Sequence, residues 1–414
     1  MKPNSFKLAV MVLSLALAPA ALASNKWYVD GVNGDDGNNC RSWANACGTI
    51  GHAISLSASG DSILIAAATY EENLNIPFSL NLSGADAKKT IIDGGYNLSV
   101  ITINSSSAHV LLSNLTIQKG AAPTRGGGVY NPGTLTVRNS IFSKNTGSSG
   151  GAIYNSGTAT IAKTVLVNNG TGGVHTAICG AITNDGTMTI VNSTLTGNSD
   201  APTNYTYGGA ICNTGTLTIN DSTLTNNQSD GVDTGAGGAI YNSGKVAINN
   251  STFSGNSASQ VYGGGAIYNE GGAIKISNST LSGNTSSGPG GGINNSSGAV
   301  TLQNSIVANS PSGGNCYGTM ASSGYNLSSD NTCNFKGAGD LNNANPNLGA
   351  LKNNGGPTQT MSLLTGSPAI DAGNPTGCTD GQGHLLKTDQ RGKPRPDHED
   401  TGGCDMGAYE RQKD

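Results

Sequence analysis

Apolar and polar residues alternate along most of this chain in short runs that glycine and asparagine separate. The octet GGAIYNSG occurs twice without change, at Gly150–Gly157 and at Gly237–Gly244. Related segments extend it to a series of seven units. The asparagines that close them are Asn131, Asn155, Asn184, Asn213, Asn242, Asn269 and Asn295. Because they lie 24 to 29 residues apart, the pattern predicts a repeated structural unit.

Each unit holds three short runs of β-forming residues and no apolar stretch of helical period. A second block follows each octet, for example GTMTIVNSTLTGN (186–198) and GTLTINDSTLTNN (215–227). The predicted fold is all-β, a right-handed parallel β-helix solenoid with three strands per coil and about 4.8 Å between coils. A leucine-rich repeat has a similar period, but it requires a denser leucine framework than this chain has.

The alternation within the octet assigns its faces. The fourth position is aliphatic and β-branched in all seven units, which predicts that it points inward. The fifth position accepts polar residues and is expected to point outward; it is occupied by Tyr130, Tyr154, Thr183, Cys212, Tyr241, Tyr268 and Asn294. The asparagine after it should lie at a turn, where stacked amides hydrogen-bond between coils.

The ends of the solenoid have their own patterns. Residues 49–57 show helical spacing with Thr49 as an N-cap, so a short helix should cover the first coil. Past residue 310 the repeat fails and cysteines concentrate, which predicts a C-terminal cap or module. The expected division is therefore a signal peptide at 1–23, an N-terminal cap with first coils at 24–118, regular repeats at 119–310, and the module at 311–414.

Composition narrows the class of protein. Lys2 and Lys7 precede the apolar run Leu8–Leu17, which is typical of a secretory signal, and no second apolar segment suggests a membrane span in the mature chain. A net charge of −4 without a dense basic run argues against nucleic-acid binding. The 8 cysteines of an exported chain favour disulfides over metal ligands. Spacing within local segments suggests the pairs Cys40–Cys47, Cys316–Cys333 and Cys378–Cys404, among many other connectivities. Cys179 and Cys212 remain, and a bond between them would bridge neighbouring repeats.

Two segments add a resemblance to known families. The entry GDSILIAAATYEENLNI (60–76) resembles the first coils of the pectate-lyase-like superfamily of β-helix proteins. The segments GSPAIDAG (366–373), TDQRGKPRP (388–396) and CDMGAYE (404–410) resemble exported bacterial proteins with a choice-of-anchor module, related to polymorphic outer-membrane proteins. That resemblance implies a glycan-related or surface role. Only Arg411–Asp414 follow the module here, so we expect release more than anchoring.

Candidate chemistry is sparse. No catalytic residue carries over from the resemblance, and paired carboxylates are not evident in the repeats. Exposed tyrosines on adjacent coils, with a small residue such as Ala152 or Ala239 beside them, suit sugar rings or another macromolecule; the alternative is that they only stabilise the sheet. These ligand-binding candidates are Tyr130, Tyr154, Tyr241 and Tyr268. The oxygen-rich turn NGDDGNN makes Asn33, Asp35 and Asp36 a Ca²⁺ candidate, although a plain turn explains it better.

The sequence therefore predicts an exported extracellular, surface or periplasmic protein without a required cofactor. Its leading function is non-enzymatic, adhesin-like binding of a polysaccharide or a cell-surface macromolecule. The alternative is a polysaccharide lyase or glycoside hydrolase acting in a groove along the β-helix. Oligomeric state does not follow from the sequence.

Overall fold

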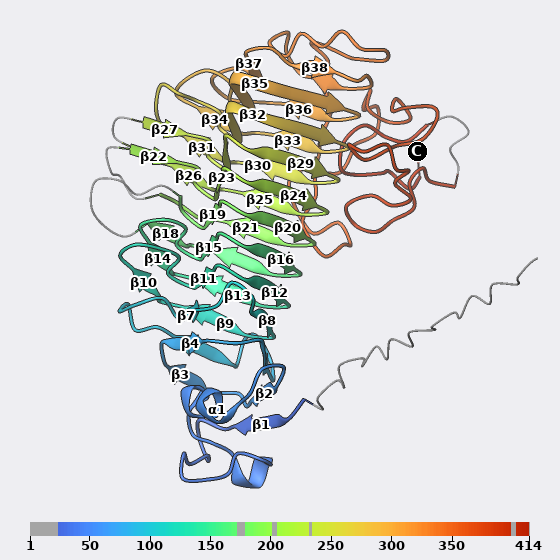
Figure 1. Ribbon diagram of the computed structural model, residues 1–414. Helices are drawn as coiled ribbons and strands as arrows, with labels where there is room; N and C mark the ends of the chain where they lie inside the picture. The colour runs from blue at the N-terminus through green and yellow to red at the C-terminus, as the bar shows by residue number, and fades with distance from the viewer. Residues whose placement is uncertain (1–23, 172–178, 201–204, 232–233, 399–402, 414) are drawn as a thin grey trace, which may run out of the picture.

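The computed structural model describes residues 24–171, 179–200, 205–231, 234–398 and 403–413, so the predicted signal peptide lies outside the described residues. The chain winds into a long parallel β-helix whose coils stack from β1 at one end to β37 at the other (Figure 1). Two ladders of strands form the largest sheet, and a third ladder forms the opposite wall. The prediction of an all-β parallel solenoid is confirmed.

The octets form the first ladder of the large sheet. Its strands are β4 (Leu74–Ile76), β7 (Ile101–Ile103), β11 (Val129–Asn131), β15 (Ile153–Asn155), β19 (Ile182–Asn184), β23 (Ile211–Asn213), β28 (Ile240–Asn242), β32 (Ile267–Ser277), β35 (Ile293–Gln303) and β37 (Cys316–Tyr317). Each octet strand pairs in parallel with its equivalent in the next coil, as Ile211 does with Ile240. The inward position is fully buried in all seven octets.

The second ladder follows after a tight turn. It comprises β1 (Lys26–Val29), β2 (Ser62–Ile65), β5 (Leu80–Gly84), β8 (His109–Ser113), β12 (Thr134–Arg138), β16 (Thr158–Ala162), β20 (Thr187–Val191), β24 (Thr216–Asn220), β29 (Lys245–Asn249), the second halves of β32 and β35, and β38 (Ala321–Ser322). Strands β37 and β38 pair with β35, so the solenoid continues past residue 310. Parallel pairing thus persists where the sequence repeat has ended.

The third ladder closes each coil. Its strands are β3 (Thr69–Glu71), β6 (Ile91–Asp93), β9 (Thr116–Gln118), β13 (Ile141–Ser143), β17 (Val165–Val167), β21 (Thr194–Thr196), β25 (Thr223–Thr225), β30 (Thr252–Ser254), β33 (Thr280–Ser282), β36 (Ile306–Ala308) and β39 (Leu327–Ser328). Several coils add a short fourth strand that the sequence did not predict: β10 (Ala121–Ala122), β14 (Thr146–Gly147), β18 (Gly170–Thr171), β26 (Gln228–Ser229), β31 (Ser257–Ala258) and β34 (Thr285–Ser286), besides the pair β22 (Tyr205–Tyr207) and β27 (Thr234–Ala236).

Buried asparagines tie the coils together in two ladders. In the octet ladder each side-chain amide donates to the side-chain oxygen of the next asparagine, at 2.7 Å from Asn184 to Asn213 and 2.9 Å from Asn213 to Asn242. A second ladder, which we did not predict, joins the side chains of Asn145, Asn169, Asn198, Asn227, Asn256 and Asn284. These bonds satisfy amides that would otherwise be buried without partners.

Short helices cover the first coil of the solenoid. The 3₁₀ helix η1 (Trp43–Asn45) and helix α1 (Ile50–Leu56) lie at the first coil, and Ile50 and Ile54 of α1 are buried there. The Thr49 hydroxyl accepts the backbone N–H of His52, which confirms the predicted N-cap. Among the described residues, no helix is both long and apolar enough to cross a membrane.

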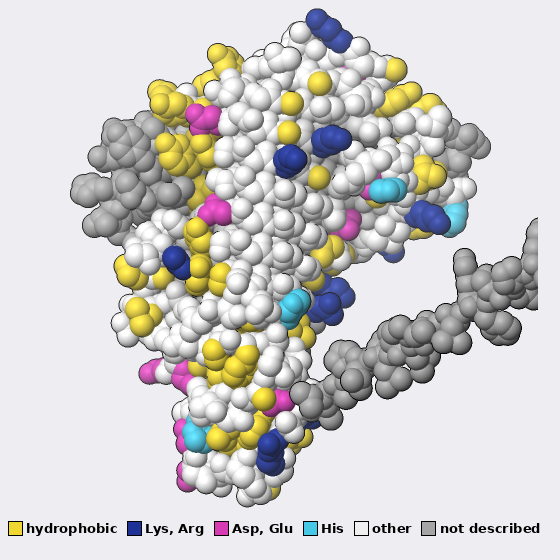
Figure 2. Space-filling view, viewed as in Figure 1, with side chains coloured by type: hydrophobic (Ala, Val, Ile, Leu, Met, Phe, Trp, Pro, Cys, Tyr) yellow, Lys and Arg dark blue, Asp and Glu magenta, His cyan; other side chains and the backbone are white. Residues whose placement is uncertain are grey.

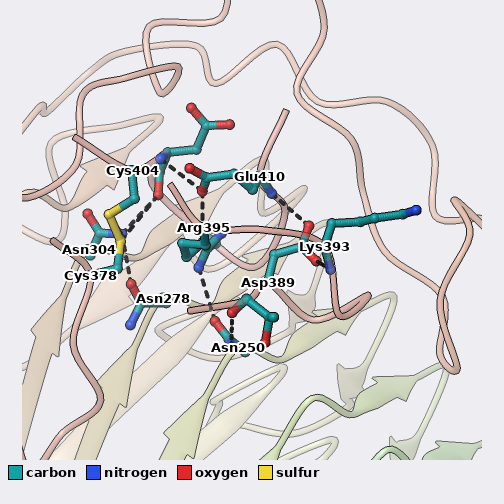
Figure 3. A network of polar contacts seen from close by, with 12 residues as sticks. Asn250, Asn278, Asn304, Cys378, Asp389, Lys393, Arg395, Cys404 and Glu410 are labelled. Atoms are coloured by element: carbon teal, nitrogen blue, oxygen red, sulfur yellow. Dashed lines mark hydrogen bonds and ion pairs between the residues drawn. A yellow bond between two sulfur atoms is a disulfide. The ribbon is translucent and has the colours of Figure 1, made fainter. Parts of the chain in front are cut away.

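The C-terminal segment lies beside the upper coils, where it covers the turn that carries Asn250, Asn278 and Asn304 (Figure 1). A buried ion pair joins Arg395 Nε to Glu410 Oε2 at 2.7 Å, and Arg395 also donates to the Asn250 side chain at 3.0 Å. Figure 3 shows this network. Breaking one partner of such a pair would leave an uncompensated buried charge, so the network fixes where the segment docks.

Candidate functional site

The fifth octet position forms a column of outward-pointing side chains, here called the tyrosine column: Tyr130, Tyr154, Thr183, Cys212, Tyr241 and Tyr268. The register places each one directly beside its equivalent in the next coil. The ring centroids of Tyr130 and Tyr154 are 5.8 Å apart, and the rings of Tyr241 and Tyr268 stack at 5.8 Å with 15° between their planes. Adjacent aromatic rings follow directly from the parallel register.

The column is less open than the sequence suggests. Tyr268 is only 4% exposed, because the edge of Tyr262 packs against its ring at 6.3 Å. Tyr207 covers part of Tyr241, with the ring centroids 4.8 Å apart. Tyr268 therefore supports the column and does not offer a free face, which corrects its place among the ligand-binding candidates.

The small residues beside the tyrosines are also buried. Ala152, Ala239 and Ala266 are fully inaccessible to solvent. The expected open floor of small side chains next to the rings does not exist, because the peptide groups of neighbouring coils pack closely at this bend. A ligand on this face would meet the three partly exposed tyrosines of the column, Tyr130, Tyr154 and Tyr241.

Two of these tyrosines are hydrogen-bonded to exposed carboxylates. The Tyr154 hydroxyl donates to Asp185 Oδ2 at 2.6 Å, and the Tyr241 hydroxyl donates to Glu270 Oε2. Asp185 and Glu270 both follow the asparagine that closes an octet, in the coil next to their tyrosine. The bonds hold each phenol ring and each carboxylate in a fixed relative position.

The hydrogen bonds change the acidity of the phenols. Donation to the Asp185 carboxylate, together with burial, raises the pKa of Tyr154 to about 12. Burial and the Glu270 carboxylate raise the pKa of Tyr241 as well. Both tyrosines thus remain protonated donors at neutral pH, and neither is prepared to act as a base.

A groove of about 570 Å³ runs along the turn that links the two ladders of the large sheet, from the coil of Thr214 past that of Gly271 to that of Gly298. Its lining includes Thr214, Ser243 and Lys245, with glycines at the base of the turn. Thr214 Oγ1 also donates to Asp185 Oδ1 at 2.8 Å, so the groove adjoins the first pair. Gly271, the residue after Glu270, lines it at the second. Stacked turns of identical shape produce this groove, since glycine recurs at the same point in every coil.

A second hollow of about 420 Å³ lies beside the first ring of the column. Thr102, Arg125 and Tyr130 line it, and the guanidinium carbon of Arg125 lies 4.2 Å from the centre of the Tyr130 ring. We did not single out Arg125 from the sequence as a binding residue, because it belongs to a loop between repeats. The stacking holds its side chain at the surface.

On the face seen in Figure 2, charged side chains are sparse over the coils, and hydrophobic side chains gather toward one border of the rod. Asp185 and Glu270 lie three coils apart, which corresponds to about 14 Å at the usual strand spacing. Glycoside hydrolysis requires two carboxyl groups within about 5–9.5 Å of each other. Asp185 and Glu270 are therefore too far apart to serve as such a pair.

The calcium candidate is a hydrogen-bonded turn. Asp35 Oδ1 accepts the N–H of Gly37, and both oxygens of Asp36 accept bonds from residues 48 and 49. Asn33 donates its side-chain amide to Asp30. The oxygens thus serve backbone and side-chain donors of the cap and are not grouped around a shared point. Among the described residues, three His, Cys, Asp or Glu ligand atoms come together only at Cys40, Cys47 and His52, where both sulfurs form a disulfide.

Four disulfides link the pairs that the sequence suggested: Cys40–Cys47, Cys179–Cys212, Cys316–Cys333 and Cys378–Cys404. The second lies within the tyrosine column, where Cys212 occupies the position of a ring. It cross-links the octets of neighbouring coils. The middle of the column is consequently cross-linked by a disulfide, with one tyrosine–carboxylate pair on each side.

Comparisons with known proteins agree with the fold. Residues 139–156 and 221–243 match the Chlamydia polymorphic membrane protein repeat. No curated protein matches the chain. Among solved structures, XylC in complex with xylose is similar with a TM-score of 0.53 and 10% identity, over 93% of this chain and 98% of that one. Pectate lyase Pel9A is similar with a TM-score of 0.47 and 15% identity, over 94% of this chain and 98% of that one. At such identities the likeness concerns the fold, a parallel β-helix.

Proposed function

We propose that this protein is exported and binds a neutral polysaccharide along its rod without cleaving it. The observation that carries this proposal is the two pairs Tyr154–Asp185 and Tyr241–Glu270, with a groove that begins beside Asp185 and passes Glu270. Aromatic faces pack against the C–H faces of sugar rings, and a fixed carboxylate accepts hydrogen bonds from sugar hydroxyls. A phenol and a carboxylate thus occur together at two points beside one groove. At the second point Tyr241 lies between the rings of Tyr207 and Tyr268, so the Glu270 carboxylate is the more accessible of the two groups.

The charges support a neutral ligand more than an acidic one. Asp185 and Glu270 would repel the carboxylates of a uronate polymer beside the groove. Lys245, which lines the groove, can donate to hydroxyl oxygens of a neutral chain. XylC, which shares the fold, was solved with the neutral sugar xylose. Four disulfides favour an oxidising compartment, in agreement with export.

The test is affinity electrophoresis of residues 24–414 through gels that contain xylan, glucomannan, polygalacturonate or alginate. We expect retardation in the neutral gels and little in the acidic ones. A double variant, Tyr154→Ala with Tyr241→Ala, should migrate as it does without polysaccharide, while its circular dichroism remains that of the parent. Retardation that persists in the double variant would contradict the site. A falling polymer mass in light scattering would instead indicate an enzyme.

A further inference from the structure

The two tyrosine–carboxylate pairs are equivalent by translation along the rod. Tyr154 and Tyr241 occupy the same octet position, and Asp185 and Glu270 both follow an octet asparagine. The register runs from Tyr154 through Thr183 and Cys212 to Tyr241, which is a shift of three coils. In both pairs the tyrosine donates to the acid of the following coil.

The tyrosines of the two pairs lie in the two segments that match the Chlamydia polymorphic membrane protein repeat, 139–156 and 221–243, whereas Asp185 and Glu270 lie outside these segments. Between them the column changes character, because Thr183 and Cys212 offer no ring. The Thr183 hydroxyl is buried there and forms no hydrogen bond with any residue that the structure describes. The column thus contains tyrosines at two places, separated by the two coils that carry Thr183 and the disulfide-bonded Cys212.

We infer that the groove is a two-point site that takes an extended neutral polysaccharide and engages it at both pairs at once. This inference rests on the function proposed above and adds the form of the ligand. The pairs are about 14 Å apart along the rod, at about 4.8 Å per coil. In an extended β-linked chain each ring advances by about one coil, so rings i and i+3 would reach the two pairs. The groove lined by Thr214 and Ser243 holds the rings between them.

Two-point binding predicts a step in affinity with length. An oligomer too short to reach both pairs binds either one weakly, so two molecules bind each protein. An oligomer that reaches both pairs binds once, and its second contact forms at the high effective concentration of a tethered group. We therefore expect a gain of at least about tenfold once the chain has about four rings. A site built from a single pocket would show no such change of stoichiometry.

The experiment is isothermal titration calorimetry of residues 24–414 with β-1,4-linked xylo-oligosaccharides from the dimer to the octamer. The trimer should bind at two similar sites, and the hexamer should bind once and at least tenfold tighter. In Asp185→Asn or Glu270→Gln, the trimer should bind at one site with its parental Kd, and the hexamer should lose its advantage. Glu71→Gln, an exposed acid of β3 in a different sheet, is the matched control and should behave as the parent.

The outcomes separate this inference from the proposed function. One site for every length, or a smooth rise of affinity with length, would overturn two-point binding while glycan binding stands. Loss of all trimer binding in either single variant would overturn it as well, since the pairs would then form one site. Absence of binding at every length, together with free migration in all polysaccharide gels, would overturn both.

Discussion

The octet asparagine ladder can be tested at its centre. Asn213 is fully buried; its side-chain oxygen accepts from Asn184, and its amide donates to Asn242 Oδ1 and to the carbonyls of Gly215 and Lys245. Because one amide has two hydrogens for three acceptors, the side chain makes three effective bonds. At about 1 kcal/mol net for each, Asn213→Ala should lower the free energy of unfolding by about 3 kcal/mol.

A second substitution separates hydrogen bonding from packing. Asn213→Asp retains the shape, but an ionised carboxylate would face three acceptor oxygens in a buried position. Burying an unpaired charge costs more than losing the bonds, so this variant should be less stable than Asn213→Ala at pH 7. The difference should shrink at low pH, where the carboxyl group is protonated and regains a donor.

Urea unfolding followed by far-ultraviolet circular dichroism gives both values from the midpoints and slopes. Ser243→Ala is the control, because that side chain is exposed in the turn of the next coil. It should unfold within about 0.5 kcal/mol of the parent, as surface changes usually do. If Asn213→Ala also falls within that range, or if the aspartate variant matches it at pH 7, the ladder does not stabilise the coils in the way argued.

Three further predictions address the core, a buried carboxyl group of the repeats and the site. Ile211→Ala, at a fully buried position, should cost about 2–5 kcal/mol in the same urea assay, whereas a cost under 1 kcal/mol would contradict the inward assignment. Burial raises the pKa of Asp221 from 3.8 to about 6. The folded state is therefore most stable below about pH 4, and this part of its stability is lost as the pH rises through 6 and the carboxyl group ionises. Asp221→Asn should raise the urea midpoint more at pH 7.5 than at pH 4.5, and an equal shift at both pH values would refute this. In ultraviolet titration, Asp185→Asn should lower the pKa of Tyr154 from about 12, and an unchanged curve would contradict the hydrogen bond.

The coils and their inward and outward faces were predictable because each position of the octet has the same structural role in every coil. An aliphatic fourth position, as at Ile153 and Ile240, alternates with an outward fifth position, and this two-residue period assigns the core. The asparagine after it is buried in all seven units, and a buried amide without a hydrogen-bond partner is unfavourable. A ladder of hydrogen bonds between the stacked side chains gives each amide its partner. The same reasoning explains Asp221, which replaces an asparagine at a turn with φ of 50°, a backbone conformation that Asn and Asp adopt more readily than other side chains.

The site was harder to predict because its contacts cross between coils through side chains of different lengths. Tyr154 and Asp185 are 31 residues apart in sequence, and Tyr241 and Glu270 are 29 apart, so no local motif connects them. The cover on Tyr268 comes from Tyr262, which belongs to a loop whose length varies between units. Strand periodicity gives no information about where such a loop folds back.

In a solenoid of this kind the functional information lies in the departures from the repeat. The turn position after the octet asparagine is serine in several units, and the chain can build that turn without charge, as at Ser156 and Ser243. Asp185 and Glu270 are therefore not needed to form the turn, and both are exposed, where a carboxylate costs little to hold. Each one nevertheless accepts a bond from a tyrosine of the preceding coil. A substitution that the fold does not require, placed twice in the same relation to an aromatic ring, is more economically explained by a ligand that repeats along the rod than by stability.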